Sequence, residues 1–444
     1  MSENKMGTEE VRKLLLTMAA PMILSMMVGA LYNVVDSLFV SQYSENALTA
    51  VSLAFPVQNI IIAAGTGIGV GINSMLSRFL GENRRQDANK TALHGIIICL
   101  AAYMLVLAFG LLGSWWFYQI QTSDKEIIAL GVSYLSVITV FGFGQMFQLV
   151  FEKLLQSTGR TSYTMWTQLV GAVLNLILDP ILIFGYFGVP SMGTRGAAIA
   201  TVVGQIAAML LGVYFNLAKN KDLDFSLKGF RLEYAYVKGI CAVGVPTILM
   251  QSMSSVMSFG VNKLLLAYTS TAAAVFGAYF KLQTFVYMAA FGLNNALIPI
   301  VAFNLGAGKK DRIRQAILAG GLYSGLIGLI GTIVMEAVPG PIMTAFSASD
   351  EMMAMGVTAL RILSLSFVFG CVSVMVSYAL QGLASGVSSL VVSAARQVLV
   401  LLPLAWLLGS VLGITGIWLG YLIAEVLVMF GAVAFLRYYY KKAV

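Results

Sequence analysis

The chain has 444 residues, of which 59% are hydrophobic and only 10% are charged, and its mean hydropathy is +0.86. Soluble domains carry about 25% charged residues, so this composition excludes an ordinary water-soluble fold and predicts a protein of the lipid bilayer. The net charge of +8 comes from basic residues spread over several short loops. Because nucleic-acid binding needs basic residues gathered on one face, we expect no nucleic-acid partner.

Long apolar runs recur from the amino end of the chain to the carboxyl end. Each is long enough for the roughly 20 residues with which a helix crosses a bilayer. Strands are excluded because the runs are too long for barrel strands and an isolated strand cannot satisfy its backbone in lipid. We therefore predict an all-α polytopic protein with twelve transmembrane helices, near residues 14–42, 47–76, 92–117, 127–151, 161–186, 195–217, 239–266, 272–302, 314–338, 352–378, 387–409 and 413–436.

The distribution of Lys and Arg predicts the orientation of these spans. Both termini, the central linker and the loops after the second, fourth and eighth spans are rich in basic residues, whereas the alternate loops hold only Lys125 and Arg195. By the positive-inside rule, both termini are expected on the cytoplasmic side. The predicted location is the plasma (inner) membrane, as a multi-pass protein.

The chain also shows an internal repeat on either side of one long polar linker, 219–238. We predict an amino-terminal lobe (1–218) and a carboxy-terminal lobe (239–444), each of six spans. An even number of spans per half makes the lobes parallel repeats around a central cleft, the geometry of alternating access, although a duplicated channel or scaffold would share it. A shift of 225 residues keeps prolines, glutamines and basic loops in register: Pro21 with Pro246, Gln58 with Gln283, Arg84–Arg85 with Lys309–Lys310, and Gln156 with Gln381.

Two aspartates lie within the predicted spans, Asp36 in the first and Asp179 in the fifth. Placing a carboxylate at the bilayer centre costs at least about 2.5–3.5 kcal/mol of insertion free energy, so we expect each aspartate to have a functional or structural role. Burial and a neighbouring acid both disfavour the ionised form, which makes protonation near neutral pH expected. Under the 225-residue shift Asp36 aligns with Val261, and matching Pro180 with Pro403 aligns Asp179 with Leu402. This acidic pair therefore occurs in the amino-terminal lobe only.

Other polar residues share the helical faces of these aspartates. They offer amide, hydroxyl and carbonyl oxygens, the ligands that a proton or a small cation prefers. Pro180 cannot donate to the carbonyl of Leu176, which is freed for other partners. The alternative is a set of interhelical hydrogen bonds that only hold the lobe together. The candidate supporting residues are Asn33, Gln168, Asn175, Pro180, Thr201 and Gln205.

The carboxy-terminal lobe contributes a different set of candidates. Glu425 could form a second ion site or pair with Arg396 of the neighbouring span, while Lys281 stands alone in the eighth span. Methionine is adaptable and aromatic faces attract cations, although such stripes also serve plain helix packing. The candidate residues of a substrate cleft are Tyr32, Gln156, Met253, Met257, Tyr279, Lys281, Gln283 and Tyr287.

The sequence resembles the multidrug and toxic compound extrusion (MATE) family over its whole length. The resemblance is carried by the two six-span halves, by the early Pro21 and Pro246, and by the motif of Asn175, Asp179 and Pro180 followed by residues 193–198. In the DinF-like and MepA-like branches, the residues corresponding to Asp36, Asn175, Asp179 and Thr201 form the cation-coupling site. The NorM-like branch instead uses an acid in the seventh span, which this sequence lacks.

The resemblance implies an antiporter that exports cationic or amphipathic drugs, with H⁺ or Na⁺ as the coupling ion. We expect no other cofactor, no metal and no catalytic residue. We expect a monomer in the lipid bilayer. The alternatives are a lipid-linked oligosaccharide flippase, which would need several cations in its inner spans, and an exporter of a specific metabolite. An intramembrane enzyme is disfavoured because the GxGD motif is absent and a single histidine does not suffice for zinc.

Overall fold

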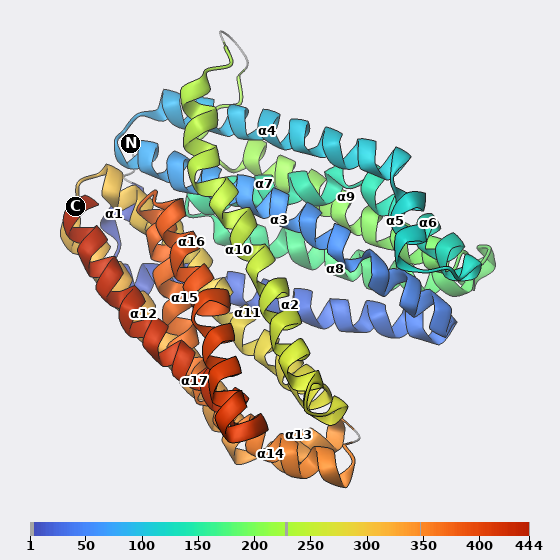
Figure 1. Cartoon of the computed structure of the whole chain (residues 1–444). Helices are drawn as coiled ribbons and strands as arrows, with labels where there is room; N and C mark the ends of the chain where they lie inside the picture. Colours follow the sequence, from blue (N-terminus) through green and yellow to red (C-terminus); the bar gives the residue numbers. More distant parts are fainter. Residues whose placement is uncertain (1–3, 227–229, 347, 444) are drawn as a thin grey trace. The chain divides into compact units, whose positions relative to one another are not determined.

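The computed structural model describes residues 4–226, 230–346 and 348–443, and every regular element in these ranges is helical (Figure 1). The predicted all-α class is therefore confirmed. The elements are α1 (Lys5–Thr8), α2 (Val11–Tyr43), α3 (Glu45–Gly81), α4 (Arg85–Leu112), α5 (Ser114–Gln121), α6 (Lys125–Val140), α7 (Phe143–Ser157), α8 (Thr161–Phe184), η1 (Tyr186–Gly188), α9 (Thr194–Ala218), α10 (Tyr234–Leu266), α11 (Ser270–Gly306), α12 (Lys310–Ala337), α13 (Pro339–Ala345), α14 (Asp350–Ser364), α15 (Ser366–Gly382), α16 (Gly386–Ala394), η2 (Ala395–Leu399) and α17 (Leu401–Ala443).

Among the described residues, nine helical runs are long and apolar enough to cross a bilayer, or eleven when the bent pairs α6–α7 and α14–α15 each count as one span. The last run, Gly386–Ala443, has 58 residues, which would be about 87 Å long if straight and so far exceeds a bilayer core of about 30 Å. It is a hairpin: Gly413 has φ 64°, and Gly420 packs on the backbone of Ala405. Counting its two arms separately gives the twelve predicted spans.

The repeat extends to the lengths of the helices. Helices α3 and α11 both have 37 residues, and α4 and α12 both have 28. Ser270 begins α11 225 residues after Glu45 begins α3, and Lys310 follows Arg85 by the same interval. The shift found in the sequence therefore also relates the two halves as structures.

Two spans expected to be continuous are bent. Helices α6 and α7 meet at 41°, and α14 and α15 meet at 42°. At the first bend the carbonyl of Val140 accepts from the Tyr103 hydroxyl at 2.5 Å, while the amide of Gly144 donates to Phe141 instead. At the second, the carbonyl of Ser364 accepts from the Thr332 hydroxyl at 2.6 Å. A side chain of a neighbouring helix thus takes a helical carbonyl at each bend, which is a recognised cause of kinks.

The helices form two compact units. Unit 1 comprises Met1–Ile23 and Leu249–Val444, and unit 2 comprises Leu24–Ile248, so the boundaries lie inside α2 and α10, just beyond Pro21 and Pro246.

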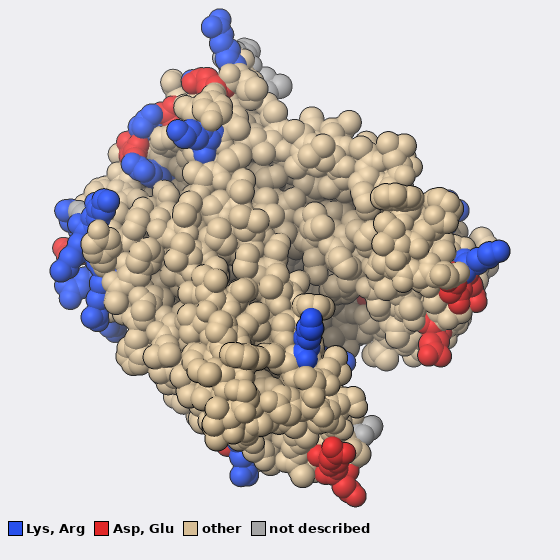
Figure 2. Space-filling view, in the orientation of Figure 1, with Lys and Arg blue, Asp and Glu red and all other residues tan. Residues whose placement is uncertain are grey.

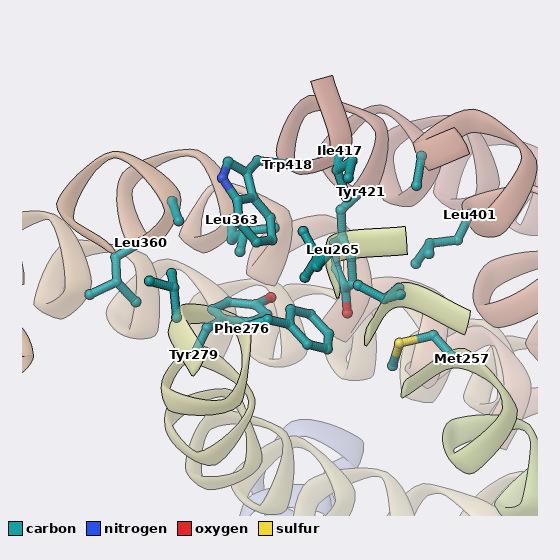
Figure 3. Close-up of a cluster of buried hydrophobic side chains, with 14 of the residues drawn as sticks. Met257, Leu265, Phe276, Tyr279, Leu360, Leu363, Leu401, Ile417, Trp418 and Tyr421 are labelled. Atoms are coloured by element: carbon teal, nitrogen blue, oxygen red, sulfur yellow. The ribbon is translucent and has the colours of Figure 1, made fainter. Parts of the chain in front are cut away.

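The core of unit 1 combines aliphatic side chains with a group of aromatic rings (Figure 3). The Phe276 ring lies 6.0 Å from Tyr279, 6.4 Å from Trp418 and 6.5 Å from Tyr421, measured between ring centroids. In unit 2, glycines permit close helix contact, and Gly67 of α3 lies against the carbonyl of Gly244 in α10.

The outer surfaces are those of a protein in lipid. Figure 2 shows broad areas without any charged side chain. On α4, for example, Leu105 is 76% exposed and Leu112 is 85% exposed. Large apolar side chains on an outer helix face cost little when the surrounding solvent is hydrocarbon. The chain is a multi-pass membrane protein.

Candidate functional site

The centre of the candidate site in unit 2 is the contact between α8 and α9. Glycines bring these helices together: a Cβ atom on Gly204 of α9 would lie 2.6 Å from the carbonyl oxygen of Gly171 in α8. Small residues at such crossings let membrane helices approach closely. One turn beyond Gly171, α8 presents Asn175 and Asp179, which are four residues apart and share a face. Both are almost completely buried.

The Asn175 amide links the acid of α8 to α9. With its nitrogen directed at Oδ2 of Asp179, 3.0 Å away, its oxygen accepts from the hydroxyl of Thr201 at 3.2 Å and from the backbone N–H of Thr201 at 3.1 Å. We assign this orientation because it satisfies both ends of the amide, whereas the reverse faces oxygen toward acceptors. Three of the four predicted coupling residues therefore form one hydrogen-bonded network.

Asp36 of α2 completes the set. Its carboxyl group lies within hydrogen-bonding reach of that of Asp179, and its Oδ1 atom is buried without a hydrogen-bond partner. Asp179 is fully buried, whereas Asp36 is half-buried. Tyr32 lies beside both carboxyl groups, and Tyr134 of α6 lies beside Asp36. Neither aspartate belongs to the salt bridges of the described residues, so no basic side chain neutralises the pair there.

Gln168, predicted to support the aspartates, binds a different carboxylate. Its amide donates to Oε2 of Glu152 at 2.8 Å, and Oε1 of Glu152 accepts from Gln148 at 3.0 Å and from Thr167 at 2.8 Å. This buried acid was not among the predicted site residues, because the predicted fourth span, 127–151, ends one residue before it. The polar residues of α8 near Gln168, which recur at helical spacing, are the sequence feature that could have indicated a buried acid on a neighbouring helix.

The remaining predicted supporters lie around the network. The Asn33 amide is exposed and donates to the carbonyl of Gly29 in its own helix at 2.8 Å. Gln205 is half-buried one turn after Thr201. Pro180 lies inside α8, which continues to Phe184. Their roles in ion coupling stay predictions.

The predicted cleft residues are distributed over both units. In unit 2, Gln156 is buried and its Oε1 atom has no hydrogen-bond partner. In unit 1, Lys281 is exposed and stands 5.9 Å from the Phe346 ring, and Met253 is half-buried. Met257, Tyr279 and Tyr287 belong to the packed core; Gln283, also buried, donates to the Tyr421 hydroxyl at 3.0 Å. A role in binding substrate stays a prediction for all of them.

The second candidate centre is the pair of Arg396 and Glu425 in unit 1. The Nε atom of Arg396 lies 3.2 Å from Oε1 of Glu425. Of the two predicted alternatives for Glu425, the structure therefore shows the pairing with Arg396.

A duplicated bundle of helices long enough to cross the bilayer defines this chain, by class, as a multi-pass membrane protein. The sequence profile described as MatE matches residues 21–181 and 246–407, one match in each half. The chain belongs to the MatE family. This confirms the predicted family, and with it the prediction that the protein is a transporter and not an enzyme.

Named relatives cover nearly the whole chain. The FAD transporter of Shewanella oneidensis is 28% identical over 425 residues, which are 94% of this chain and 92% of the relative. The multidrug export protein MepA of Staphylococcus aureus is 24% identical over 416 residues, covering 94% and 91%.

Solved structures show the same fold. An outward-facing structure of a multidrug resistance MATE family transporter of the MOP superfamily has a TM-score of 0.93 and 24% identity, over 100% of this chain and 99% of that one. A MOP superfamily transporter from Pyrococcus furiosus has a TM-score of 0.92 at the same identity and coverage.

Proposed function

We propose that this transporter is an antiporter, which exports cationic or amphipathic organic molecules in exchange for H⁺ bound by Asp36 and Asp179. The observation that carries the proposal is the contact between two carboxyl groups without a basic partner. Two ionised carboxylates in contact, one buried and one half-buried, repel each other, so a shared proton is the simplest way to hold them together. Na⁺ is the alternative coupling ion, because the oxygens of Asp36, Asp179, Asn175 and Thr201 are also suitable for a small hard cation.

The two acids lie on different helices, which gives proton binding a mechanical consequence. With one proton, the carboxyl groups of Asp36 in α2 and Asp179 in α8 attract each other through a hydrogen bond. When that proton leaves, the like charges favour separation, and α2 is the helix that moves, because Asp179 is held by Asn175 and through it by Thr201. An ion shifts such an equilibrium only through its different affinity for the two states, and the acidic pair supplies that difference.

The substrate class rests on the relatives and on the acidic site. The similarity to MepA, whose name describes multidrug export, supports export of several drugs, and the acidic site favours cationic ones. A second candidate is export of a dinucleotide metabolite, favoured by the somewhat higher identity to the FAD transporter. A lipid-linked oligosaccharide has no supporting observation of this kind.

We place both termini in the cytoplasm, in accordance with the positive-inside rule, and take the lobes 1–218 and 239–444, joined by the linker 219–238, as the parts that rock in an alternating-access cycle. The transporter is proposed to act as a monomer in the inner membrane.

The test uses purified full-length chain in liposomes, with tetraphenylphosphonium and FAD as two separate substrates. We expect tetraphenylphosphonium transport driven by a pH gradient, and Asp36→Asn and Asp179→Asn should each abolish it while the proteins remain folded. The matched control is Asp124→Asn. Asp124 caps α6 through its side chain, and asparagine caps helices equally well, so this variant should transport normally. Parallel assays with a sodium gradient separate the two coupling ions. Unchanged gradient-driven transport in both site variants would refute the assignment.

A further inference from the structure

The pair of Arg396 and Glu425 occupies the interior of unit 1 but has no role in the mechanism proposed above. Arg396 lies on η2, a π-helical turn, and Glu425 lies on the second arm of the α17 hairpin. Their side chains are only 12% and 1% exposed. Single π-helical turns inside helices occur often at functional sites, and charged groups within membrane spans are rare unless they have a function.

This ion pair is poorly hydrogen-bonded. Within the part of the chain that the structure describes, neither Oε atom of Glu425 has a hydrogen-bond partner, and Nε of Arg396 has none either, although the two residues are in contact. By contrast, Glu152 in unit 2 accepts three hydrogen bonds. Since a buried carboxylate is stabilised by hydrogen bonds to its charged form, the ionised form of Glu425 depends chiefly on the charge of Arg396.

Among the described residues that face Glu425, Arg396 is the only one that is charged near pH 7. The Arg396 guanidinium stands 5.2 Å from the Tyr287 ring. The Tyr287 hydroxyl, also without a partner, and the Glu425 carboxyl group meet at Gly370, where a Cβ atom would lie 3.3 Å from Cδ of Glu425. The titratable groups that face Glu425, Arg396 apart, are Tyr279 and Tyr287 of α11, Cys371 of α15 and Tyr421 of α17. Tyrosine and cysteine are ordinarily neutral near pH 7.

We propose that Glu425 is a second proton-binding carboxyl group, whose protonation leaves the charge of Arg396 uncompensated and thereby weakens the binding of a cationic ligand. The proton adds to one carboxylate oxygen of Glu425, and no other covalent bond forms or breaks. The buried centre changes from neutral to positively charged. The inference rests on the proposed function in one respect, because it takes the ligand to be cationic.

The effect does not require the ligand to touch Glu425. At an effective dielectric constant of about 20, one uncompensated charge on the order of 10 Å away changes the affinity for a monovalent cation by roughly tenfold. Protons and cationic substrate would then oppose each other at unit 1 as well as at the aspartates of unit 2, which is the relation that antiport requires.

The experiment measures equilibrium binding of tetraphenylphosphonium to the purified full-length chain at about pH 5.5 and about pH 8.5. It is done with Asp36 and Asp179 intact and again in the D36N/D179N variant, where those two groups cannot titrate. In both backgrounds E425Q should weaken binding at the higher pH by roughly tenfold, and in D36N/D179N it should remove the remaining pH dependence. Adding R396Q to E425Q should restore tight binding at both pH values, because the charge of the buried centre returns to zero.

A structural role for the pair predicts something different. In that case E425Q would weaken the binding of a neutral probe of similar size, such as triphenylphosphine oxide, as much as it weakens the binding of tetraphenylphosphonium. The double variant E425Q/R396Q would then bind tetraphenylphosphonium no more tightly than E425Q does. Either result, or a pH dependence that E425Q leaves unchanged in D36N/D179N, overturns the proposal. Failure of the proposed function is a separate outcome, because it is measured as gradient-driven transport by D36N and D179N.

Discussion

The two units have helices of matching length, but the buried ionisable groups at their centres are of different kinds. Unit 2 holds two acids in contact, Asp36 and Asp179, whereas unit 1 holds an acid and a base, Glu425 and Arg396. The positions do not correspond, because under the 225-residue shift Asp36 aligns with Val261. The repeat therefore determines the lengths and positions of the helices, whereas the charged residues on them differ between the two units.

The difference has a direct physical consequence. An acid pair is unstable unless it holds a proton or a cation, so ion binding is required for its integrity. An acid–base pair is neutral without a proton, so protonation is optional there and changes the net charge. We infer that unit 2 drives the conformational cycle, while unit 1 adjusts ligand affinity.

A similar difference in charge occurs in the first turns of α4 and α12. In unit 2, Asp87 accepts a hydrogen bond from Tyr236 at the start of α10. In unit 1, Arg312, which lies 225 residues after Asp87, donates to the carbonyl groups of Met6 and Glu9 at 3.1 and 2.7 Å. Each first turn thus binds a residue near the start of α10 or a segment just before α2, through an acid in unit 2 and a base in unit 1.

The largest effect on stability is expected from breaking the acid–base pair on one side. R396Q leaves Glu425 buried without its counter-charge, which should cost about 3–5 kcal/mol; E425Q/R396Q should recover most of this loss. Thermal unfolding in detergent measures both variants. The loss in R396Q should be smaller at about pH 5.5 than at about pH 8.5, because a proton can then neutralise Glu425. Equal stability of the single and double variants would contradict this description of the pair.

In unit 2 the corresponding change acts on coupling. Asn175→Leu removes the donor to Asp179 and the acceptor for Thr201, and buried polar groups without partners cost about 1–3 kcal/mol each. We expect gradient-driven transport to fall by about tenfold. The control is Asn262→Leu, since the Asn262 amide contacts only Ser258 of its own helix in the hydrogen bonds described. Equal losses in the two variants would show that the Asn175 network has no special role.

Much of this architecture could be predicted from the sequence. Apolar runs located the spans, the 225-residue shift located the repeat, and the four-residue spacing of Asn175 and Asp179 placed both on one face. The approach of Thr201 was also predictable, since the family resemblance supplied it.

The parts that sequence reasoning missed depend on contacts between distant segments. The bends at Val140 and Ser364 arise because hydroxyl groups of Tyr103 and Thr332 take helical carbonyls, and no local pattern reveals such a bond. Gln168 lies on the stripe of Asn175, yet it binds Glu152 of another helix. Helical periodicity gives the face of a residue but not the partner that the face will meet.

A smaller, pH-dependent effect is expected at the first turn of α4 in unit 2. Partial burial raises the pKa of Asp87, but hydrogen bonds from Tyr236 and Arg84 outweigh it and hold the pKa below its usual value. A lowered folded-state pKa contributes stability above the ordinary aspartate range, and this stability is lost as the pH falls through the folded-state value. Asp87→Asn should therefore lower the free energy of unfolding by about 1 kcal/mol near pH 7 and by less below about pH 4. A difference from the unsubstituted chain that does not change with pH would contradict it.

The smallest effect concerns the chain's single histidine. Nε2 of His94 accepts from the backbone N–H of Glu233 at 2.8 Å, while Nδ1 lies 2.7 Å from the carbonyl oxygen of Lys90. His94→Phe keeps a ring stacked on Tyr236, at 4.9 Å in the present structure, but removes the acceptor. Hydrogen exchange of the Glu233 amide should become about tenfold faster, with amides of α9 unchanged. No change at Glu233 would show that this hydrogen bond does not hold the linker.

The most direct test of the different roles of the two centres is a measurement of proton counterflow in liposomes. An internal pH indicator records proton movement while a tetraphenylphosphonium gradient, imposed in either direction, drives transport. If the acid pair of unit 2 is the coupling site, D36N and D179N will each abolish proton movement, whereas E425Q will retain it with altered substrate affinity. Proton flux that persists in D36N and D179N but disappears in E425Q would contradict the account, because coupling would then reside in unit 1.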